Sequence, residues 1–311
     1  MAPPVSTNRW LPLTLLCGFG LLTGLIVPLA KTAAQLGLPG PAFAFWQALG
    51  AGLAVLAVAR ARGQAIGLAP SHLRYYLVGG LVGIALPNCL IYLAVPHLGA
   101  GLTSLSYAFS PLFTLGLASV TGTERLSPRR AAGILLGVIG TLMIVLPEGQ
   151  LPRFAAPIWL VPALAAPFSL AVGNVYRTRD WPAGAKPVSL AAGILLGAAL
   201  ELLPALLLAD SHPSSVQAAL LLVAAMAATG LAYMMSLELQ RVAGPVYLSQ
   251  VSFVITATGM MIGVTFLDER YGPWVWAAIA AVFLGVGLTR SASPSPRPWP
   301  ARRKGKDCSP R

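Results

Sequence analysis

Ten long apolar segments, separated by short polar stretches, make up most of the chain. They run approximately over residues 11–30, 41–59, 75–95, 98–120, 129–147, 156–176, 188–209, 215–238, 244–267 and 273–289. A helix rises about 1.5 Å per residue, so segments of this length are suited to a hydrocarbon core of about 30 Å. A membrane-spanning segment must also pair its own backbone polar groups, which a helix does. The pattern predicts an all-α polytopic membrane protein with ten transmembrane helices.

The composition agrees with this prediction. Hydrophobic residues make up 56% of the 311 positions and charged residues only 10%, whereas a soluble domain carries roughly 25% charged residues. The net charge is +12, but the basic residues are spread over the polar connections instead of forming a patch on one face. This spacing argues against binding of nucleic acid.

The basic residues predict the orientation in the membrane. If the ten segments cross alternately, all but three of the 21 lysines and arginines fall on the side of the N-terminus, Arg177 among them. The opposite side carries Lys31, Arg153 and Arg270. Cytoplasmic loops are enriched in lysine and arginine. We therefore expect both termini in the cytoplasm.

The segments form two groups of five. A shift of 145 residues aligns six identical positions without a gap: Gly99 with Gly244, Ser104 with Ser249, Glu124 with Glu269, Arg125 with Arg270, Pro128 with Pro273 and Gly140 with Gly285. Because five is an odd number, the second group must enter the membrane with the opposite orientation. Inverted repeats of this kind recur among secondary transporters.

The resulting organisation has five parts. They are a cytoplasmic N-terminus (1–10), a first five-helix repeat (11–147), an outer linker (148–155), a second repeat (156–290) and a C-terminal tail (291–311). The tail is rich in proline and basic residues, so we expect it to be disordered in the cytoplasm. A basic tail there can contact anionic membrane lipid.

Prolines and glycines within the segments predict local features of the helices. Pro87 and Pro111 lie inside the third and fourth segments, where a proline removes a backbone hydrogen bond and bends a helix. Gly20 and Gly24 are four residues apart, as are Gly193 and Gly197. This spacing lets neighbouring helices approach closely.

Two stretches of the sequence resemble a known family. SPLFTLGLASVTGTERLSPRRAAGILLGVIGTLMI in the first half and YLSQVSFVITATGMMIGVTFLDERYGPWVWAAIAAVFLGVGL in the second are similar to the EamA branch of the drug/metabolite transporter superfamily. The resemblance extends over about residues 11–290. It implies a carrier of the bacterial inner membrane, often an exporter of amino acids or other small metabolites. It also implies a central cavity lined mainly by spans 1, 3, 4, 6, 8 and 9.

The chain departs from the family pattern at three positions. Members commonly end the fourth and ninth spans with Gly-Glu-Arg, but here Thr123 and Asp268 replace the glycines. The second span of members often carries an arginine near its start, where this chain has Gln47. That replacement weakens any anion-handling role of the position.

Glu201 lies near the middle of the seventh segment, where an ionised carboxylate is expensive to bury. Gly193, Gly197 and Pro204 lie on its side of the helix, so we expect it to face protein instead of lipid. It is a proton-coupling candidate, or it could meet a substrate ammonium. The alternative is a protonated or hydrogen-bonded glutamic acid at a helix contact, which we favour because the seventh span does not usually line the family's cavity.

Polar and aromatic side chains inside the apolar segments are candidates for substrate binding, because a site for a small polar solute needs a few such groups in an apolar wall. Asn88 aligns with Tyr233 under the repeat shift, and Ser104 with Ser249. Each candidate is equally compatible with a hydrogen bond between helices. The set comprises Asn88, Tyr92, Ser104, Tyr107, Asn174, Tyr233, Ser249 and Gln250.

Charged pairs mark several helix ends. Glu124–Arg125 and Glu269–Arg270 favour anchoring at the membrane interface, with gating as the alternative. Glu238 precedes Arg241 by three residues, a spacing that predicts a local ion pair.

The sequence lacks the common signatures of enzymes, metal sites and ATP-driven pumps. It contains no HExxH, GxSxG or GxxxxGK[ST] motif, so we expect no cofactor and no metal. We predict a secondary transporter that exports a small metabolite by alternating access, as a monomer or homodimer. The alternatives are an uncoupled facilitator and, less favoured, a membrane scaffold or a membrane-embedded enzyme.

Overall fold

The computed structural model describes residues 10–123, 127–145, 157–209 and 215–266, together with a few helical positions between 277 and 288. Within these residues every regular element is a helix, which confirms the all-α fold class. Five helical stretches are long and apolar enough to cross a membrane: Leu11–Gln35, Gly40–Ala61, Pro70–Ala94, Pro187–Leu207 and Val216–Ser249.

Most helices coincide with the predicted segments, but two helices, Leu86–Ser106 and Val216–Ser249, run through the boundaries predicted at 96–97 and 239–243. The first half contains α1 (Leu11–Gln35), α2 (Gly40–Ala61), α3 (Pro70–Gly80), the π-helix η1 (Leu81–Ala85), α4 (Leu86–Ser106), the 3₁₀-helix η2 (Tyr107–Phe109), α5 (Ser110–Val120) and α6 (Pro128–Val145). The second half contains the 3₁₀-helix η4 (Pro157–Trp159), α7 (Leu160–Arg179), α8 (Pro187–Ala209), α9 (Val216–Ser249) and α10 (Val251–Phe266). The tenth predicted segment lies mostly outside the described residues.

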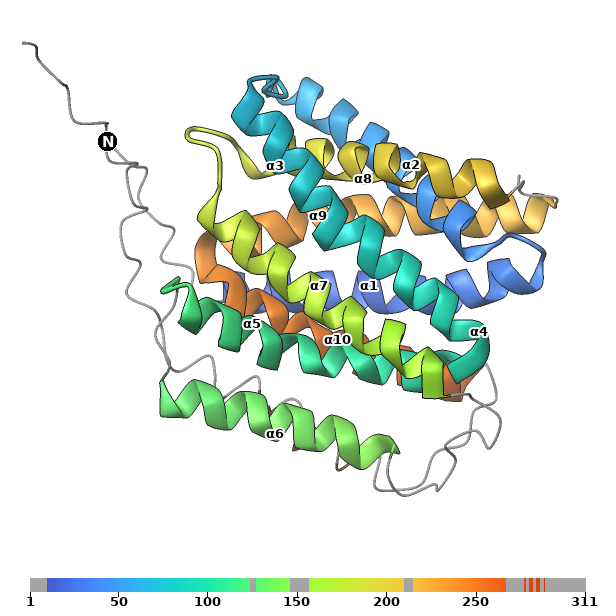
Figure 1. Ribbon diagram of the computed structural model, residues 1–311, viewed down its shortest axis with the longest axis vertical. Coiled ribbons are helices and arrows are strands. Elements are labelled where there is room, and N and C mark those ends of the chain that lie inside the picture. The colour runs from blue at the N-terminus through green and yellow to red at the C-terminus, as the bar shows by residue number, and fades with distance from the viewer. Residues whose placement is uncertain are drawn as a thin grey trace, which may run out of the picture.

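Three helices are interrupted near prolines. Pro87 lies just after the π-helical turn η1, and Pro111 lies just after the 3₁₀ turn η2. In α9 the break is at Gly244, with φ 80° and ψ 177°, and Pro245 follows it. The chain then turns into α10 (Figure 1). The first two interruptions agree with the bends predicted for the third and fourth segments, whereas the break in α9 was not predicted.

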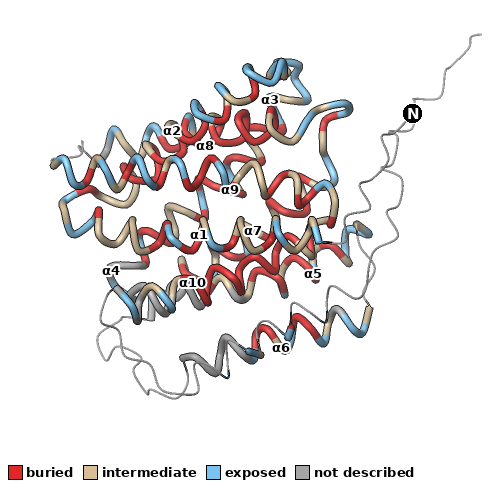
Figure 2. Tube along the Cα trace, turned by 180° about the vertical axis from the view of Figure 1, so that it is seen from behind, coloured by how far each residue is buried: buried red, intermediate tan, exposed pale blue. Residues whose placement is uncertain are grey.

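Contacts between the two halves come in reciprocal pairs. Under the predicted repeat, α1 corresponds to α7, α2 to α8, α3 and α4 to α9, and α5 to α10. Helix α1 packs on α9 and α10, and its counterpart α7 packs on α4 and α5. Helix α2 packs on α9, its counterpart α8 packs on α3, and α2 and α8 pack on each other. The buried positions on the facing sides of α2, α8 and α9 are visible in Figure 2.

Loops gather at the two ends of the helices. The α2–α3 and α7–α8 connections lie at one end, and the α1–α2 connection lies at the other (Figure 1). The first end carries Arg60, Arg62, Arg179 and Lys186, whereas Lys31 lies near the second.

Small residues allow the close packing that their spacing predicts. Gly20 of α1 lies against Val254 of α10, and Gly24, one turn further on, lies against Thr258. A Cβ at either glycine would overlap the facing side chain. The prediction that this glycine pair mediates helix packing is therefore confirmed.

Candidate functional site

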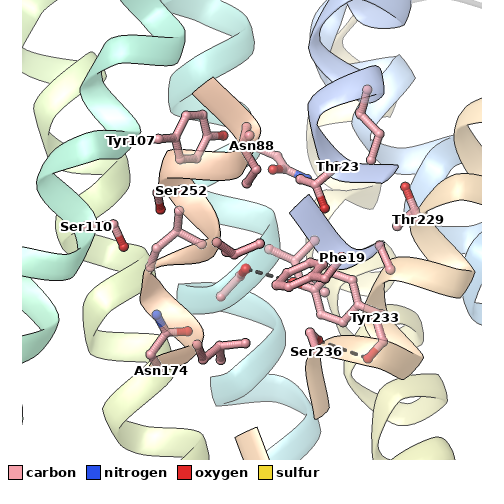
Figure 3. Close-up of a pocket in the computed structure, with 18 of the residues that line it drawn as sticks. Phe19, Thr23, Asn88, Tyr107, Ser110, Asn174, Thr229, Tyr233, Ser236 and Ser252 are labelled. Atoms are coloured by element: carbon pink, nitrogen blue, oxygen red, sulfur yellow. Dashed lines mark hydrogen bonds between the residues drawn. The ribbon is translucent and has the colours of Figure 1, made fainter. Parts of the chain in front are cut away.

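A cavity of about 100 Å³ lies between helices of the two halves. Its wall combines apolar side chains with hydroxyl, amide and phenol groups (Figure 3). Helices α1, α2, α4, α5, α7, α9 and α10, together with η1 and η2, contribute to it. The polar lining residues are Thr23, Gln47, Asn88, Tyr92, Tyr107, Ser110, Asn174, Arg177, Thr229, Tyr233, Ser236, Ser249 and Ser252.

Most of the predicted substrate-binding residues lie at this cavity. Six line it: Asn88, Tyr92, Tyr107, Asn174, Tyr233 and Ser249. Gln250 is buried, with 1% of its surface exposed, but it is not among the lining residues. The side chain of Ser104 lies outside the described residues. Their role in binding a substrate stays a prediction.

The interrupted helices form part of the cavity wall. Gly83 and Ile84 of η1 and Tyr107 of η2 face it. A π-helical turn changes the regular i to i−4 pairing of the backbone, and two nearby carbonyls accept side-chain hydrogen bonds from the second half. The Tyr233 hydroxyl donates to the Gly83 carbonyl at 3.0 Å, and the Ser169 hydroxyl donates to the Val82 carbonyl at 2.9 Å. The turn is thereby attached to α9 and α7.

Gln47 joins three helices at the cavity. Its Nε2 donates to Thr229 Oγ1 of α9 at 2.7 Å, and the Tyr92 hydroxyl of α4 donates to its Oε1 at 3.1 Å. Both ends of the amide are thus paired, although only 2% of the residue is exposed. Where members of the resembled family often have an arginine, this chain has a neutral, hydrogen-bonded group.

Arg177 is the one charged side chain among the described lining residues, and the sequence did not predict it there. We expected it among the basic residues of a cytoplasmic loop, but α7 continues to Arg179 and only 4% of Arg177 is exposed. Its Nη2 donates to Asn174 Oδ1 at 2.7 Å, and the Tyr75 hydroxyl of α3 donates to its backbone carbonyl at 3.2 Å. The available signal was Asn174 itself, which lies one helical turn earlier and therefore on the same face.

Glu201 is not among the residues that line the cavity. It is partly buried in α8, and its Oε2 has no hydrogen-bond partner among the described residues. Gly193 and Gly197 of the same helix pack on Tyr76 of α3, as their spacing predicts. Proton coupling through Glu201 stays a prediction.

The charged helix ends are only partly described. Glu124, Arg125, Glu269 and Arg270 all lie outside the described residues. The Arg241 Nη2 donates to Glu238 Oε1 within α9, which confirms the predicted local ion pair. In the described part of the chain, no three His, Cys, Asp or Glu side chains gather closely enough to hold a metal ion.

Comparison with known proteins shows what kind of molecule this cavity belongs to. Residues 10–146 match the model of the EamA-like transporter family. A protein of Escherichia coli (strain K12) named "Probable amino-acid metabolite efflux pump" is 27% identical over 224 residues, which cover 71% of this chain and 67% of that protein. The first half of the chain is therefore similar to EamA-like transporters, which supports a membrane transporter. The resemblance predicted from the sequence is confirmed.

Two further similarities concern a second relative and the fold. A Salmonella typhimurium protein of the same name is 32% identical over 120 residues, 38% of each chain. A solved crystal structure of a protein with 20% sequence identity superimposes with a TM-score of 0.72, covering 88% of this chain and 95% of the other. At that level of identity the structural similarity concerns the fold alone.

Proposed function

We propose that the protein is a secondary transporter that moves a small metabolite across the bacterial inner membrane by alternating access. An amino acid or a related compound is the expected substrate, and export is the expected direction. The two relatives named as amino-acid metabolite efflux pumps support both expectations.

The cavity between the two halves is the observation that carries the proposal. A small enclosed space with several hydrogen-bonding groups in an apolar wall suits a small polar solute. Known secondary transporters bind substrate at the interface between inverted halves, and the position of the cavity between α1, α4, α7 and α9 agrees with such a site. The reciprocal helix contacts support a ten-helix inverted repeat.

The basic residues at one end of the bundle support the proposed orientation. Arg60, Arg62, Arg179 and Lys186 lie at the end that carries the α2–α3 and α7–α8 connections. The positive-inside rule places that end in the cytoplasm. The loops then alternate so that both termini are cytoplasmic.

Growth and transport assays test the function. Cells that lack or overproduce the protein are compared on a panel of toxic amino-acid analogues, and each hit is confirmed by counterflow of the radiolabelled amino acid in proteoliposomes. Export predicts resistance on overproduction and sensitivity on deletion. Sensitisation on overproduction would contradict export, and an absence of counterflow across the panel would contradict the proposed substrate class.

A matched pair of substitutions links transport to the cavity. Ala232 lines the cavity with 1% exposure, whereas Ala54 lies on the exposed side of α2. Ala232→Phe places a ring in the cavity and should abolish counterflow, while Ala54→Phe should leave it intact. Elution of both variants as single symmetric peaks controls for folding. If folded Ala232→Phe transports fully, the cavity is not part of the transport pathway.

An uncoupled facilitator is the second candidate. One observation favours it: none of the described residues that line the cavity is acidic, so no lining carboxylate is available to carry a proton. Proteoliposomes with an imposed pH gradient distinguish the two candidates. A coupled carrier accumulates substrate above its equilibrium level, and a facilitator only equilibrates it.

A further inference from the structure

The guanidinium of Arg177 is a buried cation whose hydrogen-bonding capacity is only partly used. It lines the cavity, and 4% of the residue is exposed. Asn174 pairs with Nη2, but Nε and Nη1 have no hydrogen-bond partner among the described residues. A buried charge costs free energy unless an opposite charge or strong acceptors compensate it.

The surroundings of the guanidinium supply no carboxylate. None of the described cavity residues is acidic. Asp180, which follows three residues later, pairs with Arg74 at 3.7 Å on the exposed surface, and Glu238 pairs with Arg241. The cavity wall therefore presents one positive charge that no described acidic side chain neutralises.

The local fold makes room for this side chain and holds it. Gly79 and Gly83 lie beside it, and a Cβ on Gly83 would come within 2.8 Å of Nη1. The Tyr75 hydroxyl binds its backbone carbonyl, so the end of α7 is fixed to α3. The Tyr233 hydroxyl lies next to the guanidinium but donates its proton to the Gly83 carbonyl. Residues of α3, η1 and α9 therefore surround the side chain of Arg177.

We propose that Arg177 binds the carboxylate group of the transported solute. Guanidinium and carboxylate form paired, charge-assisted hydrogen bonds, and a planar group with two free donors is suited to that geometry. This inference rests on the proposed function and narrows it. The transporter selects small carboxylic acids, including amino acids, and a free ammonium group is not required.

Recognition by the carboxylate has a specific consequence for substrate choice. Since no described cavity residue is acidic, the wall offers an ammonium only neutral acceptors such as the Asn and Tyr oxygens. N-acetyl amino acids should therefore bind, and amides or decarboxylated amines should not. This ranking is the opposite of what a site built around a carboxylate such as Glu201 would give.

A binding assay tests the proposal independently of transport. The purified full-length protein is titrated with L-alanine, N-acetyl-L-alanine and the amide of each, and the shift of its melting temperature is followed by tryptophan fluorescence. The wild type should be stabilised by both acids and by neither amide. Arg177→Gln should raise the concentration of acid needed for half of the shift about 10- to 100-fold, because a hydrogen bond to a charged group is lost.

Two further variants provide controls. Arg179→Gln removes the same charge two residues later, from an exposed position on the same helix, and should leave the titrations unchanged. Arg177→Lys retains the charge but loses the planar pair of donors, so it should bind the acids more weakly than the wild type. If Arg177→Gln does not elute as a folded protein, the titration of Arg177→Lys tests the proposal in its place.

The possible results separate the two proposals. If the wild type is stabilised equally by acid and amide, or if Arg177→Gln and Arg177→Lys both titrate like the wild type, the carboxylate assignment is wrong. Stabilisation by inorganic phosphate but by neither acid would also overturn it. If the acids bind through Arg177 but no amino acid shows counterflow, the inference stands and the proposed transport function fails.

Discussion

The Arg177 guanidinium can occupy its place in the cavity wall because residue 83 is a glycine and has no Cβ. Gly83 lies in the π-helical turn η1, and a Cβ there would lie 2.8 Å from Arg177 Nη1 and 3.4 Å from its Cζ. The first distance is shorter than a van der Waals contact. A larger residue at position 83 would thus change the position of the Arg177 guanidinium but not its charge.

Gly83→Ala should therefore weaken carboxylate binding while the arginine is retained. The guanidinium is the flexible end of its side chain and moves away, so we expect about a 10-fold loss of affinity, since small displacements of a binding group are costly. The measurement is the melting-temperature titration with N-acetyl-L-alanine. Gly116→Ala is the matched control, because its Cβ would meet no atom within 4 Å. Equal titrations for both variants would contradict the role of Gly83.

Single residues also differ in how readily the sequence reveals them. Asn88, Tyr107 and Tyr233 could be predicted as cavity residues because a polar or phenolic group inside an apolar segment is conspicuous. Arg177 could not, because an arginine two residues before another arginine at a helix end has the pattern of a cytoplasmic loop. Its burial depends on α3 and η1, which approach it from about a hundred positions earlier in the chain.

At the scale of the helix, breaks coincide with the cavity. Pro87 and Pro111 allowed bends to be predicted, but not a π turn in one case and a 3₁₀ turn in the other. The form of the first break depends on its partners, since Tyr233 and Ser169 bind the carbonyls of Gly83 and Val82. Such long-range hydrogen bonds leave no local signature in the sequence.

The break within α9 requires a glycine at position 244. Its φ of 80° and ψ of 177° belong to a region that residues with a Cβ rarely adopt. Gly244→Ala should destabilise the protein by about 1–3 kcal/mol, the usual cost of such strain. The apparent melting temperature of the purified variant should fall by several degrees.

The control for this prediction is again Gly116→Ala, at a helical position where alanine is favoured over glycine by up to about 1 kcal/mol. Its melting temperature should stay the same or rise. If Gly244→Ala melts together with Gly116→Ala, the strained conformation at Gly244 is not needed for the fold.

At the scale of the whole molecule, the pairing of helices agrees with the predicted internal repeat. The shift of 145 residues rests on few identities, yet the helix contacts it implies are reciprocal: α1 with α9 and α10, and α7 with α4 and α5. The alternation of all loops between the two ends stays a prediction from the number of apolar segments. The position of the cavity could not be predicted, because it depends on which helices of one half meet which helices of the other.

The predicted opposite orientation of the two halves can be checked by cysteine labelling. In a background without Cys17, Cys89 and Cys308, single cysteines replace one exposed residue at the end of α1, Gln35, one at the end of α2, Ala61, and one in the α7–α8 connection, Ala183. In intact cells a membrane-impermeant maleimide should label Gln35→Cys only. After lysis it should label all three variants.

Ala183, in the α7–α8 connection, is the decisive position because it belongs to the second half. Two halves with the same orientation would place corresponding connections on the same side, so the connection after α7 would share the side of Gln35, the last residue of α1. Inverted halves place it with Ala61 instead, as the basic residues Arg179 and Lys186 around it favour. Labelling of Ala183→Cys in intact cells would therefore contradict the inverted arrangement, and with it a transport cycle in which the halves exchange conformations around the Arg177 cavity.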